Sequence, residues 1–89
     1  DLGQLRKLID ECDDSIIQEL AKRMRVAREI GMFKKENGVT VFQNNRYSEI
    51  LEKRARQGEQ CQMSGEFMKK IFEAIHEESV HVQMKLINK

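Results

Sequence analysis

The chain has no proline and no tryptophan, and aromatic residues make up only 6% of its 89 residues. The absence of proline removes the residue that most often breaks or kinks a long helix. Ala, Leu, Ile, Met, Glu, Lys, Arg and Gln dominate instead, and most of these residues favour helices. We therefore expect an all-α fold, and this length allows one small domain over residues 1–89.

The chain also lacks a strong charge imbalance, a long apolar run and a signal peptide. Charged residues make up 35% of the chain, but the net charge is only +1, so we expect no nucleic-acid partner. No segment has the length and hydrophobicity of a membrane span, so we expect no membrane partner either. The two cysteines follow no disulfide or metal-binding pattern, which indicates free thiols in a cytoplasmic protein. The chain begins with Asp1 rather than Met, which suggests a processed product or a domain of a longer polypeptide.

The spacing of apolar residues predicts three helices. Their expected bounds are 2–36, 43–56 and 64–88, with an extended connector at 39–42. Gly38 and Gly58 are expected to end the first two helices. Ser64 is expected to cap the start of the third.

The first of these helices is too long for a compact monomer. It would measure about 52 Å at 1.5 Å per residue, whereas a compact chain of this size has a radius of gyration of about 12 Å. Its apolar stripe continues almost from end to end, so the projecting half needs a partner. We expect an intertwined (domain-swapped) homodimer in which the long helices pair antiparallel. The alternative is a kink that folds the first helix back on itself.

Two cations interrupt the apolar stripe of the first helix. Arg23 and Lys34 lie about three turns apart and point the same way. No acidic residue shares the stripe with them. Because a buried cation is costly unless something pairs with it, this pattern predicts a site for an anionic ligand within a helical protein.

Ser79 interrupts the apolar stripe of the third helix in a similar way, and Gln83 lies one turn further along the same face. Ser79 could bond to its own backbone four residues earlier. Alternatively, Ser79 and Gln83 could offer hydrogen bonds to a carboxylate or ether oxygen.

Arg6 lies on the flank of the first stripe, about 26 Å along the helix from Arg23. It could share a small ligand with Arg23 only across an antiparallel dimer. The alternative is a solvated arginine that pairs with Asp10.

The joint register of six polar residues resembles the active-site set of the all-helical chorismate mutases. These residues are Arg6, Arg23, Lys34, Arg46, Ser79 and Gln83. The resemblance extends over nearly the whole chain, and its further elements are Leu5 with Ile9 and Asp13, Gly31 between Arg23 and Lys34, and Glu78 and Val80 around Ser79. It implies a domain-swapped dimer with two equivalent sites. The implied reaction is the Claisen rearrangement of chorismate to prephenate, in the shikimate pathway to phenylalanine and tyrosine, without cofactor or metal.

The resemblance also implies roles for the cationic residues. Arg6 of the partner subunit, with Arg23 and Arg46, would hold the two substrate carboxylates. Arginine suits this task because its guanidinium binds carboxylates in a bidentate manner.

The remaining residues of the set would act at the breaking bond. Lys34 and Gln83 would hydrogen-bond the ether oxygen, where negative charge gathers in the transition state. Ser79 would assist at a carboxylate or the ring. The main chain near Gln43 would close the site.

The chain departs from the family pattern beside Arg46. The family commonly has a glutamate at the next position, where it binds the ring hydroxyl, but this chain has Tyr47. An acidic position slightly earlier in the family corresponds to Gln43. Tyr47 could supply the missing contact through its hydroxyl or could only pack, so Gln43 and Tyr47 are tentative substrate-binding residues.

Two functions are the alternatives to a chorismate mutase. A related isochorismate-pyruvate lyase would share the cationic set, and a non-catalytic helical dimerisation module, regulating a fused enzyme, would share the long helix. Fusion to, or association with, an upstream shikimate-pathway enzyme is also expected.

His76 and His81 lie about 140° apart on the third helix and match no metal motif, so we expect both at the surface or the rim of the site.

Overall fold

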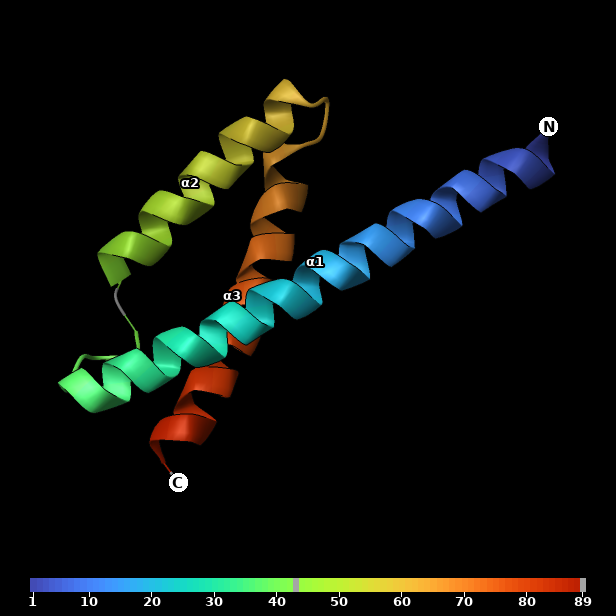
Figure 1. Cartoon of the computed structure of the whole chain (residues 1–89). Coiled ribbons are helices and arrows are strands. Elements are labelled where there is room, and N and C mark those ends of the chain that lie inside the picture. The colour runs from blue at the N-terminus through green and yellow to red at the C-terminus, as the bar shows by residue number, and fades with distance from the viewer. Residues whose placement is uncertain (43, 89) are drawn as a thin grey trace.

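The computed structural model describes residues 1–42 and 44–88. The described residues form three α-helices and no strand, which confirms the all-α expectation. The helices are α1 (Leu2–Asn37), α2 (Asn44–Gln60) and α3 (Gly65–Ile87) (Figure 1). Helix α3 packs against both α1 and α2, whereas α1 and α2 make no close backbone contact with each other in the described part of the chain.

Helix α1 is a single uninterrupted helix, so the kinked alternative is wrong. The Asp1 side chain accepts a hydrogen bond from the Gln4 backbone and forms a capping box with Gln4. At the other end Gly38 adopts the left-handed conformation, with φ 65°, and its N–H bonds to the Lys34 carbonyl. The molecule therefore extends 54 × 25 × 13 Å and has a radius of gyration of 16.0 Å.

The N-terminal half of α1 projects away from α2 and α3 (Figure 1). Only Ala27 and Gly31 of this helix are buried, and both belong to its C-terminal half. The large apolar residues of the projecting half are each more than half exposed: Leu2, Leu5, Leu8, Ile9, Ile16 and Ile17. A single chain thus leaves a long apolar surface uncovered, and soluble monomers rarely do so.

Helix α2 continues to Gln60, so the prediction that Gly58 ends it is wrong. Gly58 is buried inside the helix. A Cβ atom at this position would overlap Met68 Cγ and would lie 2.8 Å from Met68 Sδ. The glycine is therefore required by the close approach of α3 rather than by a turn.

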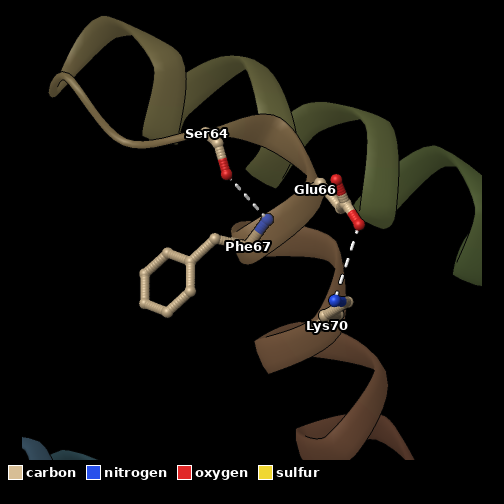
Figure 2. A network of polar contacts seen from close by, with 4 residues as sticks. All are labelled: Ser64, Glu66, Phe67 and Lys70. Atoms are coloured by element: carbon tan, nitrogen blue, oxygen red, sulfur yellow. Dashed lines mark hydrogen bonds and ion pairs between the residues drawn. The ribbon is translucent and has the colours of Figure 1, made fainter.

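The start of α3 follows the sequence prediction. The Ser64 hydroxyl accepts a hydrogen bond of 3.0 Å from the Phe67 backbone N–H. An exposed ion pair between Glu66 and Lys70, at 3.5 Å, joins the first turn of α3 to the next (Figure 2). Such an exposed pair contributes only about 0.3–0.5 kcal/mol, so the cap and the packing of α3 determine where the helix starts. Asn88 caps its other end.

In the described part of the chain, none of the three helices combines the length and the hydrophobicity needed to cross a membrane.

Candidate functional site

A cavity of about 330 Å³ lies where the C-terminal half of α1 faces α2 and α3. Its apolar walls come from all three helices and from Val41 in the connector. Its polar lining consists of Arg23 and Lys34 from α1, Arg46 and Tyr47 from α2, and His76, Ser79 and Gln83 from α3. No Asp or Glu lies among the described residues that line it. The fold thus brings six of the eight expected site residues and His76 to one cavity.

Ser79 connects α3 to the first of these cations. Its hydroxyl accepts a hydrogen bond of 2.8 Å from Arg23 Nη1 and donates one of 3.0 Å to the Ile75 carbonyl. The hydroxyl therefore bonds its own helix, as one of the two alternatives for Ser79 expected, and it also contacts Arg23. Since a guanidinium has five N–H donors, this single bond orients Arg23 and leaves donors for a ligand.

Lys34 and Gln83 form the second polar contact between α1 and α3. Lys34 Nζ donates to the Val41 carbonyl at 2.8 Å and to Gln83 Oε1 at 3.2 Å. An ammonium group has three donors, so one remains. Gln83 is only 7% exposed, and its amide nitrogen has no hydrogen-bond partner within the described residues. An ammonium donor and an amide donor thus lie side by side, held by neutral groups.

The cations of the cavity lack a balancing carboxylate. The pKa of Arg23 is lowered by burial and by the nearby charges of Arg54 and Arg46. The pKa of Lys34 is lowered by burial and by Arg46. Among residues 1–42 and 44–88, no ion pair neutralises Arg23 or Lys34, and no three His, Cys, Asp or Glu side chains could hold a metal ion. Uncompensated cations and neutral donors form an environment that suits an anion.

Tyr47 and His76 form a stacked pair at one wall of the cavity. Their ring centroids lie 3.9 Å apart and their planes are 21° apart. Phe42 lies beside both rings, with centroid distances of 6.0 Å to Tyr47 and 5.4 Å to His76. Burial and the charges of Glu73 and Glu77 raise the pKa of Tyr47. Tyr47 is therefore influenced by carboxylates of α3 rather than by the cations of the cavity.

His76 is half-buried and lines the cavity, so the sequence reading missed it as a candidate site residue. Its Nε2 atom is covered and has no hydrogen-bond partner among the described residues. One signal in the sequence could have found it, since His76 lies three residues before Ser79 and therefore on the same face of the helix. His81 is exposed, as expected.

Two of the expected site residues do not line this cavity. Arg6 lies on the exposed, projecting half of α1, about 26 Å along the helix from Arg23. The alternative ion pair between Arg6 and Asp10 is absent from the described residues. Gln43 lies outside the described residues, so the expected role of its main chain has no structural account.

Comparison with known proteins provides independent evidence. The profile of the family described as chorismate mutase type II matches residues 5–84. The chain is 34% identical over 89 residues to a bifunctional chorismate mutase/prephenate dehydratase of Buchnera aphidicola subsp. Schizaphis graminum (strain Sg), covering 100% of this chain and 23% of that protein. It is 31% identical over 84 residues to the protein of the same description from Buchnera aphidicola subsp. Acyrthosiphon pisum (strain APS), covering 94% of this chain and 22% of that protein. It spans less than a quarter of these relatives. Because the family profile covers most of its length, this chain belongs to the chorismate mutase type II family.

Proposed function

We propose that this chain is a chorismate mutase, which rearranges chorismate to prephenate on the way to phenylalanine and tyrosine. The observation that carries the proposal is the contact of 3.2 Å between Lys34 and Gln83, in a cavity lined also by Arg23 and Arg46 and without a described carboxylate. Chorismate has two carboxylates and an ether oxygen, and these groups match the cations and the amide. Membership of the family supports the same reaction.

The rearrangement occurs within one molecule. The ether C–O bond breaks while a C–C bond forms, so no nucleophile, proton transfer or cofactor is required. Arg23 and Arg46 hold the carboxylates, and Ser79 fixes Arg23 through the bond of 2.8 Å. These contacts restrain the substrate in a reactive shape, which removes part of the barrier.

Lys34 and Gln83 act on the charge that develops during the reaction. As the ether bond breaks, negative charge gathers on its oxygen. The remaining N–H of Lys34 and the amide N–H of Gln83 donate to that oxygen. Because both groups are already held by α1, α3 and the Val41 carbonyl, they stabilise the charge with little reorganisation.

The active form is proposed to be an intertwined, domain-swapped homodimer with two shared sites. The uncovered apolar surface of α1 supports this assembly, since six large apolar side chains of its projecting half are each more than half exposed. An antiparallel partner would cover that surface. It would also bring Arg6 of the partner subunit to a carboxylate beside Arg23. Sedimentation equilibrium should show a dimer at micromolar concentration, and a stable folded monomer would contradict the assembly.

The larger context of the chain is also part of the proposal. Residues 1–89 form one mutase domain of a longer protein, with a prephenate dehydratase part as in the two Buchnera relatives. The expectation of a fused enzyme of the same pathway has its support there. Cys12 and Cys61 are both free and exposed, which is consistent with the reducing cytoplasm as the location.

An assay of the isolated chain tests the function. Loss of chorismate should be accompanied by equimolar prephenate, and Lys34→Ala should abolish most of the turnover. Isochorismate should not be cleaved. Formation of pyruvate and salicylate from isochorismate, without prephenate formation from chorismate, would indicate the lyase instead. A stable dimer with no turnover of either compound would indicate a non-catalytic dimerisation module.

A further inference from the structure

His76 lines the cavity, but the proposed mechanism gives it no role. His76 Nε2 is the buried side-chain nitrogen or oxygen that lacks a hydrogen-bond partner among the described residues. Buried polar atoms are nearly always paired, so each exception needs an explanation. His76 lines the cavity together with Ser79 and Gln83 from the same helix. Its position therefore suggests that the missing partner is a ligand.

The imidazole is held firmly from one side. Tyr47 stacks on it with a centroid distance of 3.9 Å and an interplanar angle of 21°. Phe42 lies at 5.4 Å and is inclined by 59°. Phe42 is also 43% exposed, so of the two aromatic neighbours it can move with the smaller loss of packing.

The charges around His76 favour a neutral imidazole. Burial lowers its pKa, and the cations Arg23 and Lys34 on α1 lower it further, while Glu77 on its own helix opposes them. From α2, the titratable group that faces it is Tyr47. A neutral imidazole has one nitrogen that donates and one that accepts. It is therefore suited to a neutral hydroxyl, whereas carboxylates will prefer the neighbouring cations.

We propose that His76 hydrogen-bonds the ring hydroxyl of the substrate, and that Tyr47 is a positioning residue that holds the imidazole by stacking. The proposal rests on the proposed function, because the hydroxyl is that of chorismate. Arginines take the two carboxylates, and Lys34 with Gln83 takes the ether oxygen. The ring hydroxyl is then the remaining polar group of the substrate, and His76 Nε2 is the remaining buried polar atom of the described cavity.

Tyr47 is the competing candidate for this contact, since it also lines the cavity. The carboxylates Glu73 and Glu77 dominate the charges near its phenol and raise its pKa. The two cations of α1, Arg23 and Lys34, instead lower the pKa of His76. Both shifts leave the ring neutral, so the observation that favours the imidazole is its Nε2, which is buried without a partner among the described residues.

The test compares chorismate with an analogue in which hydrogen replaces the ring hydroxyl. The readout is the ratio of kcat/KM for the two compounds. His76→Leu removes the hydrogen bond but keeps much of the volume, and it should lower this ratio about tenfold or more. His76→Gln, which retains a donor and an acceptor, should restore part of it. The matched control is His81→Leu, an exposed site on the same helix, which should leave the ratio unchanged.

Variants of Tyr47 separate the two candidates for the contact. Tyr47→Phe keeps the stack and should keep the ratio, whereas Tyr47→Ala should lower it. If Tyr47→Phe alone abolished the preference for the hydroxyl, the contact would belong to the phenol and the proposal would be wrong. If His76→Leu and His76→Gln lowered kcat/KM equally for both compounds, the proposal would also be wrong, because His76 would then have only a structural role.

The outcome for the wild type distinguishes this proposal from the one on which it rests. Turnover of chorismate with an unchanged ratio in the His76 variants would overturn the role of His76 alone. No turnover of chorismate by the wild type would overturn the proposed function and this inference together. Circular dichroism at the assay concentration confirms that each variant is folded, and Tyr47→Phe provides a decisive result if His76→Leu does not fold.

Discussion

Replacing Gly31 by alanine tests how closely α1 and α3 must approach for the site to work. A Cβ atom at Gly31 would lie 3.1 Å from Gln83 Cγ, 3.2 Å from Gln83 Cα and 3.2 Å from Leu86 Cδ1. Carbon atoms in ordinary contact are about 3.5–4.0 Å apart. Because Gln83 Cα belongs to the backbone, a side-chain rotation cannot relieve the contact. Helix α3 must therefore shift by a few tenths of an ångström.

The effects of Gly31→Ala on stability and on activity should differ in size. Overpacking costs about 1–3 kcal/mol, but alanine gains about 1 kcal/mol over glycine within a helix. The free energy of unfolding should therefore fall by only about 0–2 kcal/mol. The shift acts directly on Gln83, whose Oε1 accepts from Lys34 at 3.2 Å. A misplacement of this kind should lower kcat by about 10- to 100-fold.

Gly58→Ala is the matched control for this prediction. Its Cβ atom would overlap Met68 Cγ and lie 2.8 Å from Met68 Sδ, and neither Gly58 nor Met68 lines the cavity. This variant should lose more stability than Gly31→Ala but keep its kcat per folded molecule. Urea unfolding and steady-state kinetics on both variants provide the comparison. If Gly31→Ala kept the kcat of the wild type, the reasoning would be refuted, whatever the size of its loss of stability.

Three further predictions concern the polar groups of the cavity. Lys34→Ala should lower kcat far more than it raises KM, because the charge that Lys34 meets exists mainly in the transition state; a change confined to KM in steady-state kinetics would place Lys34 on a carboxylate. Gln83→Glu should lose activity at neutral pH, where its carboxylate is ionised beside the developing oxyanion, and regain it towards a pH of about 4.3; a pH–rate profile like that of the wild type would remove Gln83 from the ether oxygen. Folding lowers the pKa of His76 from 6.5, so the unfolded chain binds a proton more readily, and the free energy of unfolding should decrease as the pH falls below about 6.5 and level off below the folded-state pKa. Chemical denaturation should show a weaker decrease of the free energy of unfolding in His76→Leu over that pH range. The same pH dependence in His76→Leu and in the wild type would contradict a lowered pKa of His76.

The local features of the fold were predictable from the sequence because their causes lie within a few residues. The cap at Ser64 and the left-handed stop at Gly38 each depend on a single turn of helix. Gly58 shows where this reasoning fails. Its role depends on Met68, which lies on another helix. The sequence alone does not distinguish a glycine needed for close packing from a glycine that ends a helix.

The candidate site divides in the same way. Arg23, Lys34, Ser79 and Gln83 were identifiable because polar residues interrupt apolar stripes, and the structure places all four at one cavity. The role of Val41 was not identifiable from the sequence. Val41 contacts Lys34 through its main-chain carbonyl, and a main-chain contact leaves no pattern of side chains in the sequence. His76 was missed because its place on the Ser79 face of the helix is a weak signal until its stack on Tyr47 is known.

The shared nature of the site is tested most directly by mixing two inactive variants. Arg6→Ala and Arg23→Ala homodimers should each have almost no chorismate mutase activity. After joint unfolding and refolding at equal concentrations, half of the dimers should contain one chain of each kind, and each of these should carry one site with both arginines intact. The mixture should therefore recover up to about a quarter of the wild-type activity. No recovery, with dimers of mixed composition verified by mass spectrometry, would contradict a site built from Arg23 of one chain and Arg6 of the other.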